Sequence, residues 1–548
     1  MKKVAIFGGG VGGCSVAHEL SKCVDKNGNP FYDITIYEKK YEIGGLARSN
    51  RDEDGCATEY CWRVYFDFYK NVFKVMSEIS LIDDNKKTVL NNLTKCSHRN
   101  VSDLPFSLKD KIISYKNVFD GMTSCDDRLI ELDNLTWQKS LEGTNNSHLF
   151  RAIGPWLGGD RYNYSYKSVI RVGFEMDMYP GIFDSTVYNY VTTKPTSEAW
   201  FNHWTAHLKK QGVKINFGES LFSVRINEEK SKILSTVVID DKNNTFIVEA
   251  DYYVFSLPVE VLDIIVKKTP KLQIYEQFRN IEKLKNIALH MQLSFQLYFD
   301  RSISLGIGSS NIDTNDFLLV DSPWDIIVLQ YDKIYKDTKL CEKLPNVKGG
   351  WSVAACTAYI PGIIYGKPFN KCNYEEIIAE LWAQMYTSKE LQRIIMKNNG
   401  YYLDKSMVIK WSPMWPTYKF NEKTGYLETS EPKFTNNAGT YKLRPSFKTD
   451  IKNLFISTAY VKETLDIFSM EAACISGKYV AHEISKKDIK SIKNCTLPPI
   501  IVKRPALLSP LRAIDSFFYR LGLPNMSLII VIIVIIMIII LVIKFLKK

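Results

Sequence analysis

Glycines at a fixed spacing near the start of the chain have the arrangement needed to bind a phosphate group. Residues 8–13 read Gly-Gly-Gly-Val-Gly-Gly, which places Gly8, Gly10 and Gly13 in a G-x-G-x-x-G motif with Gly12 as an additional glycine. In such a motif the first glycine allows a tight turn and the second lets the backbone approach a pyrophosphate. The third lets the following helix pack closely. We therefore predict that this segment binds a dinucleotide.

The flanking residues predict the elements that must position these glycines. The apolar run at 4–7 predicts a strand buried on both faces, and the periodicity of 13–20 predicts a helix whose N-terminus faces the phosphates. A second apolar run at 34–37 ends in Glu38, an acid placed to accept hydrogen bonds from a ribose. The acid follows the glycines at a longer distance than usual, and the polar residues 25–30 account for the excess as an enlarged turn.

A second glycine pair follows the acid and distinguishes between FAD and a nicotinamide as the cofactor. Gly44 and Gly45 precede Arg48 in the segment Gly-Gly-Leu-Ala-Arg-Ser, so more glycine backbone and a cation come near the same pyrophosphate. The glycine fingerprint, Glu38 and this segment together resemble the flavoprotein superfamily of amine oxidases, phytoene desaturases and hydroxysqualene dehydroxylases. The resemblance implies FAD as the cofactor, because a nicotinamide enzyme has no need of the second pair.

The same resemblance assigns further cofactor contacts along the chain. It implies that Val224 touches the adenine side and that backbone N–H groups at Ser469 and Met470, where a helix begins, bind the pyrimidine end of the flavin. The chain departs from the superfamily at Ala459, where an aspartate is usual. We expect Glu463 or a nearby hydroxyl to substitute, or the affinity for flavin to be weaker.

Other chemistry-bearing residues give weaker signals. Trp62 and Arg63 resemble a segment that runs beneath the flavin, but they are equally compatible with an aromatic core and an arginine paired with an acid. His203 and His207 have metal-compatible spacing without the glutamate of H-E-x-x-H, so we expect surface or hydrogen-bonded histidines. No nucleophilic or paired-carboxylate arrangement stands out. This suits an enzyme whose cofactor performs the redox step, and it leaves the catalytic residues unassigned.

Composition narrows the class of protein. The 548 residues are 45% hydrophobic and 13% aromatic, as in an ordinary globular chain with more than one domain. The net charge of +11 comes from scattered lysines, with no basic stripe that predicts nucleic-acid binding. The eleven cysteines include no C-x-x-C pair and no signal peptide precedes the first strand, so we expect mostly reduced thiols in a domain that faces the cytosol.

The C-terminal region has a distinct character. Residues 488–525 carry several prolines and predict a linker, with a short amphipathic piece at 511–521. Residues 526–543 are apolar throughout and reach about 27 Å as a helix, enough for a thin bilayer. We therefore predict a single-pass C-terminal membrane anchor, with the basic residues Lys503, Arg504, Arg512 and Arg520 near anionic headgroups.

The predicted fold is α/β: a discontinuous Rossmann-like FAD-binding domain with an inserted α+β substrate domain and a C-terminal transmembrane helix. The predicted segments are the FAD-binding domain at 1–70, 196–265 and 446–487, the substrate domain at 71–195 and 266–445, the linker at 488–525 and the span at 526–543. The alternating run 291–299 predicts a sheet strand that walls an apolar substrate cavity or forms plain core.

We expect an oxidoreductase that exchanges a hydride between FAD and an apolar, isoprenoid-like or lipid-like substrate, with an amine as the next choice. Two alternatives from other classes stay open. One is a non-redox flavoprotein such as an isomerase or mutase, and the other is a structural membrane protein on a decayed oxidoreductase scaffold. The sequence does not predict the oligomeric state.

Overall fold

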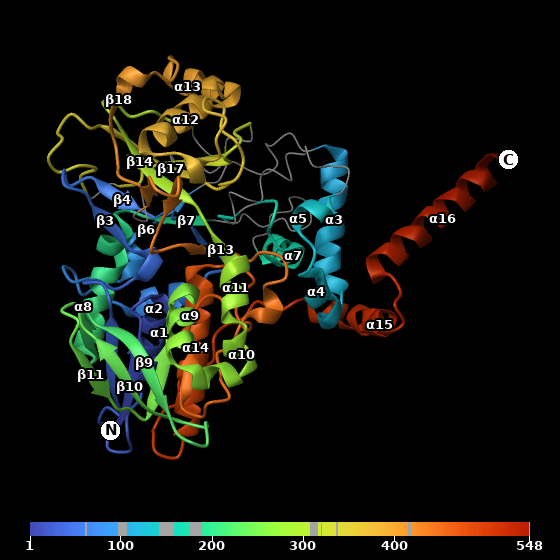
Figure 1. Ribbon diagram of the computed structural model, residues 1–548. Coiled ribbons are helices and arrows are strands. Elements are labelled where there is room, and N and C mark those ends of the chain that lie inside the picture. The colour runs from blue at the N-terminus through green and yellow to red at the C-terminus, as the bar shows by residue number, and fades with distance from the viewer. Residues whose placement is uncertain are drawn as a thin grey trace.

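The computed structural model describes residues 1–60, 63–96, 107–141, 158–159, 161–175, 189–306, 316–318, 321–335, 338–414 and 418–546. In Figure 1 the first elements of the chain and the late helix Met470–Lys487 lie together in the lower part of the body, where a parallel sheet lies between helices. A second sheet with its own helices forms the upper part, and the last helix projects away from the body on the right.

The central sheet is built from strands that lie far apart in the sequence. It has five strands in the order β22-β12-β1-β2-β8, and all neighbouring pairs are parallel. The strands are β1 (Lys2–Phe7), β2 (Tyr32–Glu38), β8 (Lys214–Phe217), β12 (Tyr252–Phe255) and β22 (Leu454–Ile456). Their apolar sequences fit because helices and further strands cover both faces of such a sheet. The predicted Rossmann-like α/β fold is confirmed.

Two helices from opposite ends of the chain pack against each other beside this sheet. They are α1 (Val11–Leu20) and α14 (Met470–Lys487), and both lie in the lower body in Figure 1. They approach closely because Gly477 faces α1: a Cβ atom added there would lie 2.6 Å from the carbonyl oxygen of Gly12. The C-terminal helix is thereby held against the helix that follows the glycine motif.

The sequence predicts one meander from the apolar or alternating runs at 213–217, 221–226, 233–239, 245–248 and 252–257, but the structure divides these runs between two sheets. Only β9 (Ser220–Ile226), β10 (Ile233–Ile239) and β11 (Thr245–Val248) form an antiparallel meander. The runs at 213–217 and 252–257 enter the central sheet as β8 and β12. The prediction of one continuous meander was wrong because parallel pairing places the buried strand β12 beside β1 and the edge strand β8 beside β2.

The second sheet is antiparallel, in the order β15-β16-β17-β14-β18. Its strands are β14 (Leu293–Phe299), β15 (Asp316–Leu318), β16 (Ile326–Gln330), β17 (Gly349–Ala355) and β18 (Val408–Trp411), and the helices α12 (Tyr374–Thr387) and α13 (Lys389–Asn399) share its core. The polar residues of β14 are buried too. One of them, Gln296, donates a hydrogen bond from Nε2 to the Glu59 carbonyl at 3.3 Å. This sheet therefore packs directly on the first part of the chain.

The remaining elements connect or cover these sheets. The helices are α2 (Lys70–Glu78), α3 (Leu108–Thr123), α4 (Asp126–Leu132), α5 (Trp137–Ser140), α7 (Tyr166–Glu175), α8 (Asn202–Lys210), α9 (Val259–Lys268), α10 (Glu276–Arg279), α11 (Ile281–Ala288), α15 (Ser509–Arg520) and α16 (Met526–Leu546). The strands are β3 (Ser49–Arg51), β4 (Ala57–Glu59), β5 (Tyr65–Phe66), β6 (Leu93–Cys96), β7 (Asn189–Thr192), β13 (Leu289–His290), β19 (Lys419–Asn421), β20 (Tyr426–Glu428) and β21 (Lys433–Phe434).

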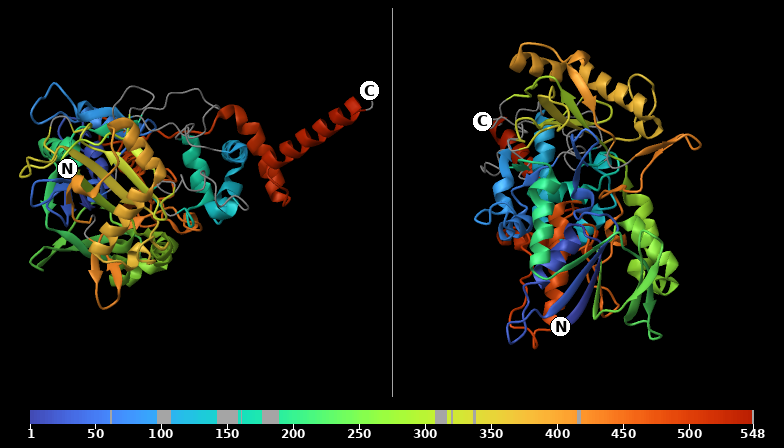
Figure 2. Two further views of the ribbon diagram at one scale, coloured as in Figure 1. Left: turned by 90° about the horizontal axis from the view of Figure 1, so that it is seen from above. Right: turned by 90° about the vertical axis from the view of Figure 1, so that its left-hand side faces the viewer.

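The segment predicted as a linker is fixed to the body. The buried carboxylate of Asp515 on α15 accepts hydrogen bonds from the amides of Cys125, at 2.8 Å, and Met526, at 3.2 Å. Arg504 donates to the Ser124 carbonyl at 2.5 Å, and Arg512 donates to the Met122 carbonyl at 3.1 Å. These two arginines, predicted near lipid headgroups, therefore bind the α3–α4 turn. Figure 2 shows α15 and α16 on one side of the body.

The helix α16 runs outward from this attachment, and its aliphatic side chains are exposed, as at Ile538 and Leu541. Taken over the residues that the structure describes, no helix is long and apolar enough to cross a membrane. The predicted span at 526–543 therefore finds no support in the fold.

One cysteine pair differs from the predicted reduced state. Cys56 and Cys341, separated by 285 residues, form a disulfide. The two meet because the Ala57 amide donates to the Leu340 carbonyl at 3.1 Å, which aligns the two segments. Seven other cysteines among the described residues form no disulfide, in line with the prediction for most of them.

Candidate dinucleotide-binding site

The glycine motif forms the turn between β1 and α1 as predicted. Gly8 has a φ of 105°, and a Cβ atom there would lie 2.2 Å from the Ser256 carbonyl oxygen. A Cβ atom on Gly13 would lie 2.1 Å from the Gly8 oxygen, and one on Gly12 would lie 2.4 Å from the Ser457 oxygen. Gly10 differs, because nothing lies within 4 Å of an added Cβ atom. Open space in front of Gly10 is what close approach of a pyrophosphate requires.

The second glycine pair lies directly against the first motif. The Gly44 amide donates to the Gly9 carbonyl at 2.8 Å, and a Cβ atom on Gly45 would be 3.4 Å from the Gly10 Cα atom. Gly44 itself has a φ of 113° and backs onto the Phe201 ring, so a side chain would not fit. We call residues 8–13 together with 44–45 the glycine site. The structure brings together all the glycines that the sequence predicted.

Glu38 lies at the edge of the glycine site. Its two carboxylate oxygens accept hydrogen bonds from the backbone amides of Gly9, at 2.6 Å, and Lys40, at 2.8 Å. Burial raises the pKa of Glu38, and these amide hydrogen bonds oppose the rise. Each carboxylate oxygen can accept more than one hydrogen bond, so Glu38 keeps capacity for the hydroxyls of a ribose.

Arg48 lies beside the glycine site but is held by protein groups. Its Nη1 donates to the Gly45 carbonyl at 2.8 Å, and its Nη2 lies 2.9 Å from a Glu431 oxygen. Its Nε lies 3.3 Å from Glu42, whose pKa is raised by burial although Arg48 opposes this. No local sequence pattern points to Glu431 as a partner of Arg48, because 383 residues separate the two.

The end of β22 faces the same region of the sheet. The buried Ser457 hydroxyl has no hydrogen-bond partner in the part of the chain that the structure describes, and it points toward Gly12. Glu463, one predicted substitute for the missing aspartate, instead accepts hydrogen bonds from the Ser446 hydroxyl and the Phe447 amide. The sequence predicted that Glu463 or a nearby hydroxyl replaces the carboxylate missing at Ala459. Because Glu463 is engaged elsewhere, the Ser457 hydroxyl is the better candidate of the two.

The start of α14 is the predicted contact with the flavin. The Ser469 hydroxyl caps the helix by accepting a hydrogen bond from the Ala472 amide at 3.2 Å, so its side chain serves the helix itself. Met470 begins the helix, where the first backbone N–H groups lack partners within the helix. Phe468, just before the cap, packs on Phe434 of β21, with ring centroids 5.4 Å apart.

Arg63 contacts the segment that follows the second glycine pair. Its Nη2 donates to the Leu46 carbonyl at 2.6 Å, and its Nε lies 3.4 Å from Glu59. Glu59 also accepts a hydrogen bond from the Thr196 amide at 2.8 Å, and burial raises its pKa to about 7 against the effect of Arg63. Of the two interpretations left open by the sequence, the pairing with an acid is therefore present. Trp62 lies outside the described residues.

Val224 and the two predicted histidines contact protein groups. Val224 is buried in the core between β9, β10 and α9, so its predicted contact with adenine stays a prediction. His203 accepts a hydrogen bond at Nδ1 from the Ile82 amide at 3.0 Å. His207 stacks on His18 with ring centroids 5.0 Å apart, and burial lowers its pKa to about 4.

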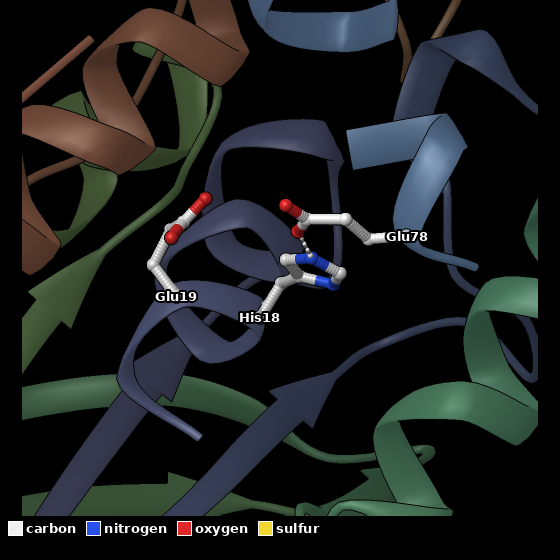
Figure 3. A group of neighbouring side chains, drawn as sticks. All are labelled: His18, Glu19 and Glu78. Carbon is white, nitrogen blue, oxygen red and sulfur yellow. Dashed lines mark hydrogen bonds and ion pairs between the residues drawn. The ribbon is translucent and has the colours of Figure 1, made fainter. Parts of the chain in front are cut away.

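His18, Glu19 and Glu78 form the one group of candidate metal ligands among the described residues (Figure 3). The His18 Nδ1 atom accepts a hydrogen bond from the Trp204 indole at 3.3 Å, so Nε2 carries the proton and donates it to Glu78 at 2.9 Å. That nitrogen then has no lone pair to offer a metal. The Lys22 ammonium lies 2.6 Å from Glu78 and supplies the positive charge. The group does not fit a metal ion.

The fold defines a Rossmann-type α/β protein with a second, antiparallel sheet. Residues 6–79 match the family described as NAD(P)-binding Rossmann-like domain. The chain is 21% identical over 329 residues to the 15-cis-phytoene desaturase of Synechococcus elongatus, a match that covers 55% of this chain and 66% of that protein.

A crystal structure of an oxidoreductase from Methanosarcina mazei has a similar fold, with a TM-score of 0.54 and 14% identity. The similarity covers 88% of this chain and 99% of that one, and it extends the likeness of fold to both sheets. These comparisons support the predicted resemblance to the superfamily of amine oxidases and desaturases.

Proposed function

We propose that the chain is an FAD-dependent oxidoreductase that transfers a hydride between the flavin and an apolar small molecule. The observation that carries the proposal is the hydrogen bond from the Gly44 amide to the Gly9 carbonyl, at 2.8 Å. It joins two glycine segments into one surface in front of the open space at Gly10. A surface of this kind, made of backbone that can be approached closely, suits a diphosphate.

FAD fits the site better than a nicotinamide cofactor because the binding features extend beyond the first motif. The second glycine pair, the buried Ser457 hydroxyl and the start of α14 follow one another along the carboxyl ends of the sheet strands, where ligands of open α/β sheets bind. The residues that would hold FAD are Gly8, Gly10, Gly12, Gly13, Glu38, Gly44, Gly45, Arg48, Val224, Ser469 and Met470. When bound, FAD supplies hydride transfer.

Residues of this chain would provide position and electrostatics. The N-terminus of α14 carries a partial positive charge, which favours negative charge on a group placed against Met470. Glu59 can hold a proton on its carboxylate near neutral pH, since burial brings its pKa to about 7, while the neighbouring Arg63 stays charged. Both residues are deep in the protein, where such charges act strongly because water is excluded.

An apolar substrate, such as an isoprenoid or another lipid, is favoured over an amine. Three strands of the second sheet, β14, β16 and β17, are buried along their whole length and rich in aliphatic and aromatic side chains. The similarity to a protein named as a phytoene desaturase supports the same choice. An amine is the second choice, because the resemblance includes amine oxidases.

The proposal includes a location at a membrane, with the aliphatic side chains of α16 as the contact with lipid and the body on the cytosolic side. Support comes from the aliphatic side chains of α16, several of which are about half exposed. Alkaline extraction of membranes from cells that make the full chain, compared with a chain that ends at Asn525, tests this part. Release of both chains into the soluble fraction would contradict it.

The central test is the anaerobic spectrum of the purified full-length protein with lipid extracts and amines added in turn. We expect a yellow protein whose flavin absorption bleaches with an apolar substrate. Bleaching with amines and release of hydrogen peroxide would favour an amine oxidase. Activity only with pre-reduced flavin, without net electron transfer, would favour an isomerase. A colourless protein that does not take up added FAD would contradict the proposal and favour a structural role on a decayed scaffold.

A further inference from the structure

The ion pair between Arg48 and Glu431 occupies the place where a dinucleotide phosphate would need a cation. The Arg48 guanidinium is buried and donates to the Gly45 carbonyl, so it lies against the glycine site. One of its nitrogens, Nη2, contacts both oxygens of Glu431, at 2.9 and 3.0 Å. As placed, the charge of Arg48 is neutralised by the protein.

Glu431 reaches this position from a distant part of the chain. It lies in the short connection between β20 and β21, and its amide donates to the Thr429 hydroxyl at 3.1 Å. The same carboxylate lies 3.8 Å from the Lys40 ammonium. Glu431 therefore serves as the counter-ion of two cations next to the glycine site.

The surroundings of this ion pair are rich in negative charge. Glu42 also contacts Arg48, and Glu38 lies at the glycine turn with its carboxylate bound to the Gly9 amide. A diphosphate would add two further negative charges to this partly buried region. Like charges at short range in a medium of low dielectric constant repel strongly, so the diphosphate gains little from Arg48 while Glu431 holds it.

We propose that Glu431 competes with the diphosphate of the dinucleotide for Arg48, so that binding of the dinucleotide displaces the Glu431 carboxylate. The displacement moves residues 429–432, which lead into β21 and its contact between Phe434 and Phe468. Glu431 is thus a determinant of dinucleotide affinity. The inference rests on the proposed function in one respect: the glycine site binds a diphosphate.

The test compares the full-length E431Q variant with wild type in titrations with ADP, FAD and adenosine at low salt. We expect the Kd for ADP and FAD to fall roughly tenfold in E431Q, because a competing charge is removed from Arg48. Adenosine has no phosphate, so its Kd should not change. The matched control is E428Q on β20, whose exposed carboxylate pairs with Asn421 instead.

Combining E431Q with R48Q should abolish the gain. A Kd for ADP that is unchanged or higher in E431Q would overturn the inference, since a higher value means that the Arg48–Glu431 pair closes over the bound dinucleotide. If neither wild type nor E431Q binds ADP or FAD, both the inference and the proposed function fail. Binding by wild type with no gain in E431Q overturns the inference alone.

A second measurement uses the unmodified chain. Hydrogen–deuterium exchange of the peptide 426–433 should rise when ADP is added, because the displaced Glu431 releases its segment from Arg48. Exchange that is unchanged or slower at saturating ADP would contradict the displacement. Peptides from the β19 strand, at 419–421, serve as the internal reference.

Discussion

The carboxylate of Glu471, in the first turn of α14, accepts hydrogen bonds from both the backbone amide and the side-chain amide of Asn71, at 2.9 and 2.6 Å. A second oxygen accepts from the Val72 amide at 2.9 Å. These are among the first amides of α2, which lack partners within their own helix. Glu471 therefore joins the start of one helix to the start of another and lies behind the predicted flavin contact at Met470.

This arrangement predicts a pH-dependent stability. Burial raises the pKa of Glu471 from 4.5 to about 7, although the hydrogen bonds from Asn71 oppose the rise. Because the folded protein favours the protonated carboxyl, the stabilisation is complete below pH 4.5 and is lost as the pH rises through about 7. We expect E471Q, which cannot ionise, to flatten the fall in melting temperature over this interval, by an amount worth about 1–3 kcal/mol at most.

Thermal melts at a series of pH values provide the measurement for Glu471. The exposed Glu276 on α10 gives a matched control, since E276Q should leave the pH profile as in wild type. Glu59 and Glu260, whose pKa values burial also raises to about 7, keep part of the slope in E471Q. A profile for E471Q as steep as that of wild type would show that Glu471 does not titrate as stated.

The glycines of the site predict two distinct classes of variant. G10A adds a methyl group to open space, so we expect normal folding but a loss of affinity for FAD of roughly tenfold or more, since the methyl group occupies the approach of the phosphates. G13A places a methyl group 2.1 Å from the Gly8 oxygen and should lower the stability by about 1–3 kcal/mol. Melting temperatures and FAD titrations of both variants separate the two effects. Equal destabilisation by G10A and G13A would be inconsistent with the geometry at Gly10.

The glycine turn forms as predicted, and it shows why part of the fold can be predicted from the sequence. The turn at Gly8–Gly13 and the strand at 34–37 depend on local steric demands and apolar runs, which the sequence states directly. The disulfide partner of Cys56 and the carboxylate that holds Arg48 come from residues 341 and 431. Such long-range partners depend on how the whole chain packs, and a single sequence contains no local signal for them.

The division of the meander has the same explanation. The run at 213–217 has the alternation of a half-buried strand, and its pairing with β2 is set by the sheet beside it rather than by its own residues. For residues 488–525, prolines mark the absence of regular structure, but they do not show whether the segment is attached to the body. Its attachment depends on Asp515, a single buried acid.

The disulfide between Cys56 and Cys341 predicts a stability that depends on reductant. It closes a loop of 285 residues between the start of the chain and the second sheet region, and disulfides of this kind contribute typically about 2–4 kcal/mol. We expect reductant to lower the melting temperature of wild type but not of the double variant C56S/C341S. The C495S variant removes a thiol that is already free and should respond as wild type does. A melting temperature of wild type that ignores reductant would argue against the bridge.

The attachment of α15 predicts how the C-terminal region is released. The buried Asp515 carboxylate accepts from the Cys125 amide, from the Arg128 side chain at 3.0 Å and from the Met526 amide. D515A leaves these donors unpaired in a buried place, at a cost of about 2–4 kcal/mol, so α15 should detach from α3 and α4.

Limited digestion with trypsin measures this release, because Arg512 and Arg504 donate to carbonyls of the α3–α4 region in the attached state. We expect cleavage after Arg512 to be at least several-fold faster in D515A than in wild type, whereas Pro505 blocks cleavage after Arg504 in both. D127N changes an exposed acid in the first turn of α4 and should not alter the rate. Equal rates in D515A and wild type would mean that other contacts hold α15.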